Sequence, residues 1–80
     1  MTVYSVLTDG NTSEASIVVF ATKESALKYI EEDVKRVITL LEEEDYEIDG
    51  TENNGAGHAF VNAVYGTWYS WDIYVGELRD

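Results

Sequence analysis

The sequence predicts an α+β domain, in which an antiparallel sheet of β-β-α-β-β order packs on one face against a single helix. Short runs of β-branched and aromatic residues flank one long segment whose apolar residues recur at helical spacing, and turn-forming residues separate the runs. A chain of 80 residues has room for one core, so residues 1–80 are expected to form a single compact domain.

Two strands are expected before the helix, at Val3–Leu7 and Ile17–Phe20. Both are rich in β-branched residues, and the connecting segment Asp9–Ser13 is rich in turn formers. Asp9-Gly10 is suited to the positive φ that a hairpin turn requires. The two strands are therefore predicted to pair antiparallel.

The helix is predicted to begin after Thr22, which is suited to cap it, and to reach the acidic run that starts at Glu42. Its apolar residues form one stripe: Ala26, Leu27, Ile30, Val34, Val37, Ile38 and Leu41. Three acid-first i,i+4 pairs are expected on the opposite face: Glu24 with Lys28, Glu31 with Lys35 and Glu32 with Arg36.

Two further strands are expected after the helix, at His58–Tyr65 and Trp68–Val75, with a turn at Gly66-Thr67. The segment Tyr46–Asp49 alternates apolar and acidic residues, which suits an additional short edge strand, and Gly50–Gly57 is predicted to be a polar loop. The last strand should turn its more apolar set toward the helix: Tyr69, Trp71, Ile73 and Val75. Trp68, Asp72 and Tyr74 would then lie on the open face.

Negative charge is concentrated in one part of the sequence. The chain has a net charge of −11, and no Lys or Arg lies between Arg36 and Arg79. Seven carboxylates fall within eleven residues: Glu42, Glu43, Glu44, Asp45, Glu47, Asp49 and Glu52. The first four oppose the helix dipole, which is unfavourable for stability. This run indicates either a site selected for binding or a solvated helix end that leads into a loop.

The residues of known chemistry favour no catalytic or metal site. Cysteine is absent, and the single His58 has no second His or Cys to complete a zinc site. Gly55-Ala56-Gly57 lacks the following Lys of a phosphate loop, and the acidic run lacks the ligand spacing of a calcium loop. We therefore expect a protein that is not an enzyme, with no cofactor and no metal, although a cation-binding module is a further alternative.

The charge also limits the partners. A strongly acidic surface opposes adsorption to anionic lipid and direct contact with DNA or RNA phosphates, so the expected partner is a protein with a basic surface. The sequence shows neither the pattern of a signal peptide nor a membrane span, and we expect a cytoplasmic protein. Both a monomer and a homodimer fit the sequence.

The segment Ile17–Ile30, preceded by Val3-Tyr4-Ser5-Val6, resembles the opening of many small phage-encoded proteins: a strand, then Phe-small-Thr/Ser-basic-Glu-x-Ala at the start of a helix. The remainder is similar in general character to compact acidic phage inhibitors of the anti-defence type, among them anti-CRISPR proteins and anti-restriction DNA mimics. This resemblance implies a role in blocking the DNA-binding surface of a host defence complex. It carries over no site residues.

The leading hypothesis is an acidic, non-enzymatic inhibitor that binds the basic nucleic-acid-binding surface of a protein or complex. The seven clustered carboxylates would replace phosphates, and aromatic residues would supply affinity. The alternative is a small structural or adaptor domain, as a monomer or a homodimer, whose acidity serves solubility only. The predicted partner-binding residues are Glu42, Glu43, Glu44, Asp45, Glu47, Asp49, Glu52, Trp68, Trp71 and Tyr74.

Overall fold

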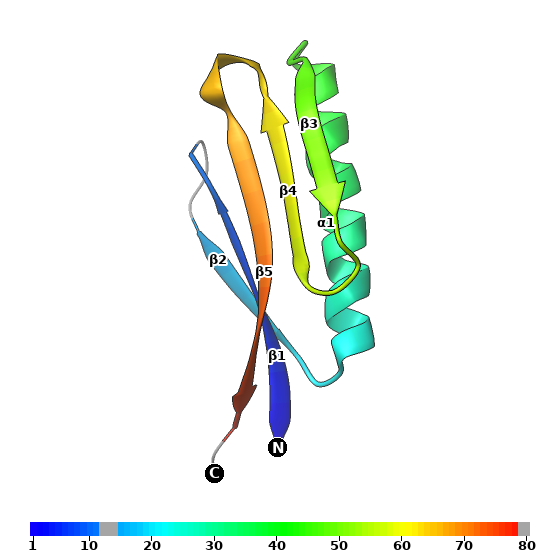
Figure 1. Ribbon diagram of the computed structural model, residues 1–80, viewed down its shortest axis with the longest axis vertical. Coiled ribbons are helices and arrows are strands. Elements are labelled where there is room, and N and C mark those ends of the chain that lie inside the picture. Colours follow the sequence, from blue (N-terminus) through cyan, green and yellow to red (C-terminus); the bar gives the residue numbers. More distant parts are fainter. Residues whose placement is uncertain (12–14, 79–80) are drawn as a thin grey trace.

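The computed structural model describes residues 1–11 and 15–78 of the chain and confirms the predicted fold class (Figure 1). One helix packs against a five-stranded antiparallel sheet with the strand order β2-β1-β5-β4-β3. The elements in chain order are β1 (Thr2–Gly10), β2 (Ser16–Phe20), α1 (Lys23–Glu43), β3 (Ile48–Asn53), β4 (His58–Ala63), the short 3-10 turn η1 (Val64–Gly66) and β5 (Trp68–Glu77).

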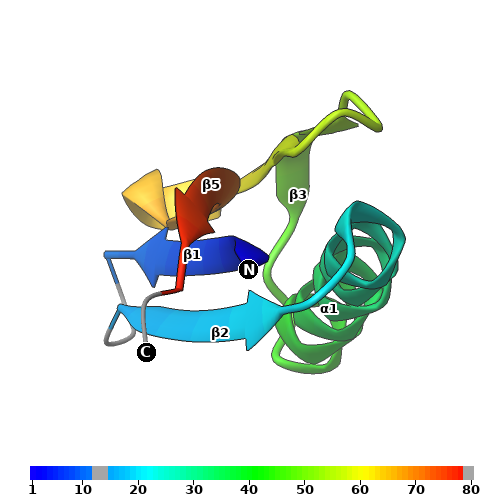
Figure 2. The ribbon, with the colours of Figure 1, turned by 90° about the horizontal axis from the view of Figure 1, so that it is seen from below.

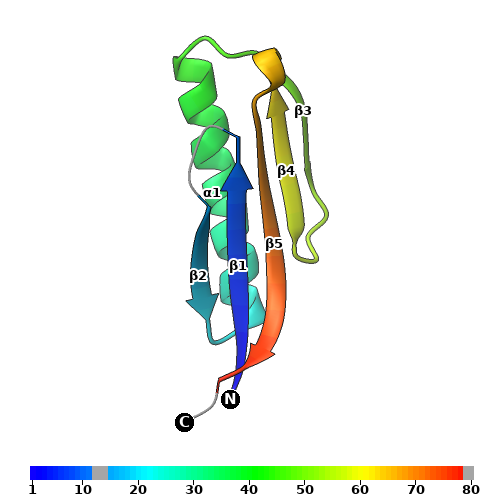
Figure 3. The same ribbon diagram turned by 90° about the vertical axis from the view of Figure 1, so that its left-hand side faces the viewer.

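The sheet curves around α1, which lies on its concave side (Figure 2). The strands and the helix run along the length of the molecule, which measures 46 × 22 × 16 Å (Figure 3). Strand β5 is the central strand and pairs with β1 on one side and β4 on the other. Val6 of β1 lies opposite both Val18 of β2 and Ile73 of β5. The free edges of the sheet are therefore β2 and β3.

Helix α1 begins where the sequence predicts. Thr22 has extended backbone angles, and its Oγ1 accepts a hydrogen bond from the Ser25 N–H at 3.2 Å, which satisfies one of the free donors of the first turn. The buried members of the predicted apolar stripe face the sheet: Ala26, Ile30, Val34, Val37 and Leu41. The stripe thus sets which side of the helix covers the sheet.

The core lies between α1 and the concave face of the sheet. Alternate residues of β4, Ala59, Val61 and Ala63, are buried there, as the predicted alternation requires. Trp71 of β5 is completely buried at the centre of this core. The prediction for the last strand holds only in its first part, because the end of β5 extends past the helix and leaves Val75 exposed.

Several predicted boundaries differ from the structure. The edge strand that was expected at Tyr46–Asp49 is β3, and it extends through four residues of the predicted loop Gly50–Gly57. Main-chain pairing with β4 holds these polar residues in the sheet, so strand formation here does not depend on apolar side chains. The last hairpin turns through η1 and Thr67 instead of Gly66-Thr67 alone. Asp9 and Gly10, predicted to lie in the first turn, are instead the last residues of β1, and Gly10 does not have a positive φ. Residues 12 and 13 of the predicted first turn lie outside the described residues.

Candidate partner-binding surface

Six of the seven clustered carboxylates gather at one end of the molecule, where α1 ends and β3 begins (Figures 1 and 3). We call this surface the acidic end and define it by Glu42, Glu43, Glu44, Asp45, Glu47 and Asp49. All six residues are exposed. Within residues 1–11 and 15–78, none of them forms an ion pair. Their charges are therefore exposed to solvent and available to a cationic partner.

A Schellman motif fixes the backbone of the acidic end. Asp45 adopts a left-handed conformation with φ 62°, the position that glycine usually occupies. The Tyr46 N–H donates to the Leu41 carbonyl at 2.8 Å, and the Asp45 N–H donates to the Glu42 carbonyl at 3.1 Å. The carboxylates of this turn thus project from a hydrogen-bonded backbone and not from a loose helix end.

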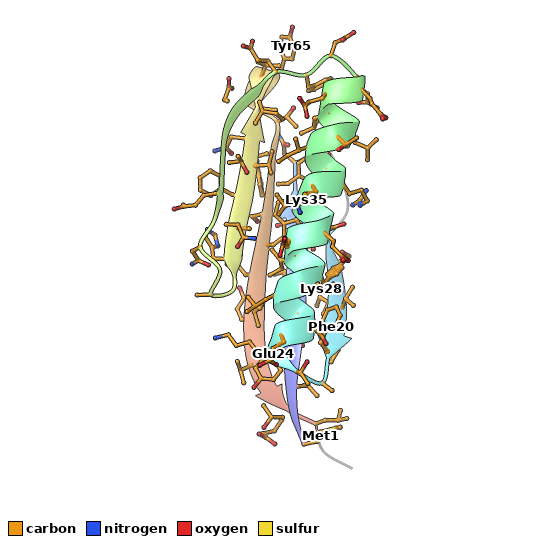
Figure 4. The ribbon with its side chains drawn as sticks, turned by 90° about the vertical axis from the view of Figure 1, so that its right-hand side faces the viewer. Met1, Phe20, Glu24, Lys28, Lys35 and Tyr65 are labelled. Carbon is orange, nitrogen blue, oxygen red and sulfur yellow. The ribbon has the colours of Figure 1, made fainter. Side chains whose placement is uncertain are left out.

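The positive charges lie elsewhere on the described part of the chain. Lys23, Lys28, Lys35 and Arg36 are all on α1 before its last two turns. Of the three predicted i,i+4 pairs, Glu31–Lys35 is present at 3.4 Å. Figure 4 shows Lys28 and Lys35 along the helix, well away from its acidic end. The unpaired negative charge of the acidic end is thus separated, along the length of the molecule, from the Lys and Arg side chains of α1.

The predicted pair between Glu32 and Arg36 is wrong. Arg36 Nε instead donates to Asp33 Oδ1 at 2.7 Å. The Asp33 carboxylate is largely buried and held by the core, so it offers a fixed acceptor, whereas Glu32 is exposed. This hydrogen bond raises the pKa of the Arg36 guanidinium. No ion pair between Glu24 and Lys28 is present among the described residues.

Sequence reasoning did not identify Tyr65, the most exposed of the large hydrophobic residues in the described chain. Tyr65 lies in η1, is 90% exposed and has a positive φ of 65° (Figure 4). Its ring packs edge-on against Tyr46, with the ring centroids 6.0 Å apart. A large aromatic residue in a hairpin turn, next to Gly66, is the signal in the sequence that could have marked it, because turn positions usually carry small polar residues.

Trp68 lies just after η1, on the open face of the sheet, and is exposed as predicted. Its backbone is held by Asn11, whose Oδ1 accepts from the Trp68 N–H at 3.0 Å and whose Nδ2 donates to the Gly66 carbonyl at 2.6 Å. Two aromatic side chains are thus exposed near the acidic end: Tyr65 within the turn η1 and Trp68 just after it.

Three of the predicted residues do not join this surface. Trp71 is completely buried between the sheet and α1, so its prediction as a surface anchor is corrected: it packs in the core because its strand face points at the helix. Tyr74 is exposed, but it lies six residues along β5 from Trp68, about 20 Å away. Glu52 pairs opposite Phe60, farther along β3 than the acidic end.

Two further ionisable side chains of the described chain, His58 and Asp72, are in contact with each other. His58 Nδ1 lies 2.7 Å from Asp72 Oδ1 on the open face, and both side chains are partly exposed. In the described residues, no three His, Cys, Asp or Glu side chains come together in a way that would hold a metal ion. The described part of the chain also contains no helix long and apolar enough to cross a membrane.

In comparisons with known proteins, the chain matches no protein-family model, no curated protein sequence and no solved structure.

Proposed function

We propose that this protein is a non-enzymatic inhibitor that binds the basic nucleic-acid-binding surface of a protein or complex, with the acidic end taking the place of phosphates. The proposal rests on one observation: six exposed carboxylates without an ion pair within the described chain lie at one end of the molecule, beside the exposed ring of Tyr65. A role against a host defence system, as the resemblance to phage inhibitors implies, is part of this proposal.

The charges and the rings have different roles in such a complex. Unscreened carboxylates attract a basic surface from a distance and raise the association rate, and this effect weakens as salt is added. Aromatic side chains supply affinity once the partners touch, because they bury a large area with few rotatable bonds. Tyr65 and Trp68 are positioned for this role, whereas the buried Trp71 is not.

The shape of the acidic end also supports a binding role. Four acidic residues close the helix against its dipole, and Asp45 holds a left-handed conformation that glycine would adopt without strain. If the acidic residues served solubility alone, they would do so equally well at exposed positions in the middle of the helix. There they would neither oppose the helix dipole nor require a strained backbone. The second candidate, a small adaptor domain, is instead favoured by the exposed apolar side chains of β2, Ile17, Val18 and Val19.

The experiment is affinity capture from a nuclease-treated bacterial lysate on the immobilised chain, followed by elution with increasing salt. The proposal predicts recovery of a DNA- or RNA-binding protein that elutes as the salt rises. The test variant carries Glu42→Gln, Glu43→Gln, Glu44→Gln and Asp45→Asn. A matched control carries Glu24→Gln, Glu31→Gln, Glu32→Gln and Glu77→Gln, which removes the same charge from other positions.

The two variants separate the candidates. Loss of capture by the test variant with retention by the matched control supports the inhibitor. Equal capture by both variants supports the adaptor, since its acidity would then serve solubility wherever it lies.

A further inference from the structure

The two free edges of the sheet differ in how they are protected against pairing. Natural proteins shield exposed edges with charged residues, proline or bulges. Strand β3 carries Asp49 and Glu52 and has a bulge between Ile48 and Gly50. Strand β2 has none of these devices: the run Ala15–Thr22 contains no charged residue and no proline, and β2 pairs with β1 in an unbroken register.

Strand β2 is also exposed on both faces of the sheet. Ile17 and Val19, which are 66% and 57% exposed, point to the open face, and Val18 lies on the helix side. Exposing these apolar side chains to water is unfavourable in free energy. Pairing with another strand would bury them and remove this unfavourable contribution.

We propose that this edge is covered by a second copy of the same chain, with β2 pairing antiparallel to β2 and Val18 on the two-fold axis. In this register Ile17 lies opposite Val19 of the second copy, on the same face of the sheet, because directly paired residues share a face. The pairing of Ile17 with Val19 and that of Val18 with its copy therefore join β-branched side chains, the kind of cross-strand pair that stabilises sheets.

The helix side of the pairing joins a large residue to a small one. The same register places Phe20 of the second copy opposite Ser16. Ser16 lines a hollow of about 340 Å³ whose other walls come from β1, α1 and β5 and are both polar and apolar, with Arg36 and Leu40 among them. The Phe20 ring packs against Tyr29 of its own chain, with the ring centroids 5.3 Å apart, so in this register it lies beside the small Ser16 side chain and does not fill the hollow.

The charge distribution permits the pairing despite the net charge of −11. A two-fold axis through Val18, perpendicular to the sheet, reverses the direction of the second copy. The acidic end lies at the opposite end of the molecule from the N-terminus (Figures 1 and 4), so the two acidic ends of the dimer lie at opposite tips of a continuous ten-stranded sheet. Both remain free for partners, and they repel each other least in this arrangement.

The absence of cysteine makes a direct test possible. A chain with Val18→Cys carries a single thiol, and antiparallel pairing on the two-fold axis brings the two Cα atoms to about 4.5–5.5 Å, within the range that a disulfide spans. The matched control is Thr51→Cys, an exposed position on the opposite edge that also lies on the helix side. We expect mild oxidation to cross-link the first variant to the dimer and to leave the control as a monomer.

The mass of the unmodified chain in solution provides the second measurement. We expect light scattering to give twice the 9.0 kDa of one chain. A variant with Ile17→Lys and Val19→Lys should weaken self-association by about tenfold or more, while its circular dichroism stays that of the folded chain. Val75→Lys, at an equally exposed apolar position on β5, is the matched control and should leave the dimer intact.

Two results would overturn the proposal. A monomer at millimolar concentration would exclude self-pairing and leave the edge to a strand of another protein. A dimer in which Val18→Cys cross-links no better than Thr51→Cys would place the interface elsewhere. Neither measurement involves the nucleic-acid-binding partner, so failure here is independent of failure of the proposed function.

Discussion

The indole Nε1–H of Trp71 donates a hydrogen bond to Asp33 Oδ2 at 2.9 Å, and this bond joins the centre of the sheet to the helix. The other oxygen of the same carboxylate accepts from Arg36 Nε at 2.7 Å. Asp33 therefore satisfies the one polar group of a completely buried Trp71 and is itself neutralised by a cation at the surface. This arrangement fixes the helix against β5.

Removing the carboxylate should destabilise the fold. Asp33→Ala leaves the buried indole N–H without its acceptor, so we expect the free energy of unfolding to fall by about 2 kcal/mol. Urea denaturation followed by tryptophan fluorescence measures the change. Glu32→Ala, at the exposed neighbouring position, is the control and should change stability by less than about 0.5 kcal/mol. Equal losses in the two variants would show that the hydrogen bond contributes nothing.

The end of the helix should be less stable than it could be. Asp45→Gly removes both the left-handed strain at φ 62° and a charge that opposes the helix dipole, so we expect a gain of about 1 kcal/mol. Thermal denaturation checks this value. Glu44→Gly removes the same charge at φ −92°, where glycine relieves no strain, and should give no comparable gain. A destabilised Asp45→Gly variant would refute this account of the turn.

Gly57 should be required by the hairpin between β3 and β4. Its φ is +123°, and a Cβ there would meet the Ile73 side chain at 3.2 Å. Gly57→Ala is therefore expected to lower the free energy of unfolding by about 2 kcal/mol. Gly50→Ala, where an added Cβ meets nothing within 4 Å, should be close to neutral. Chemical denaturation compares the two, and a neutral Gly57→Ala would contradict the prediction.

The stability of the fold should decrease at alkaline pH through Tyr29. Burial raises the pKa of the Tyr29 phenol above its usual 10.0, and the negative charge of the Asp33 carboxylate raises it further. Above pH 10.0 the unfolded chain therefore loses this proton before the folded chain does, and the free energy of unfolding falls as the pH rises through the folded pKa.

Denaturation at a series of pH values, with Tyr29→Phe as the variant, measures this contribution. The variant lacks the phenol and should lose less stability across the alkaline range. Tyr65→Phe, which removes a phenol oxygen from a 90% exposed side chain, is the control for the substitution itself. Parallel curves for Tyr29→Phe and the unmodified chain would contradict the assignment.

The fold could be predicted because periodicity reports which face of each element is buried. The Thr22 cap, the helical stripe and the alternation in β4 all correspond to the observed burial. The extent of β3 could not be predicted in this way, because Gly50–Asn53 is polar and depends on main-chain pairing with a strand that follows later in the chain. The hydrogen bond between Asp33 and Trp71 likewise joins residues 38 positions apart.

The candidate site was predictable in its charges but not in its aromatic residues. A run of carboxylates with no nearby Lys or Arg cannot be neutralised locally, so all seven residues are exposed, and six of them lie at one end of the molecule. Which ring accompanies them depends on how the hairpins pack, and this packing buries Trp71, moves Tyr74 away and leaves Tyr65 at the turn. Sequence spacing alone does not contain that information.

The most direct test of the central claim is the association rate with the captured partner, measured over a range of salt concentrations. If the acidic end recognises a basic surface, the rate of the unmodified chain falls steeply with salt, and the Glu42→Gln, Glu43→Gln, Glu44→Gln, Asp45→Asn variant loses most of this dependence. An association rate that stays constant from low to high salt, or that depends on salt equally in both chains, would contradict the proposed role of the acidic end.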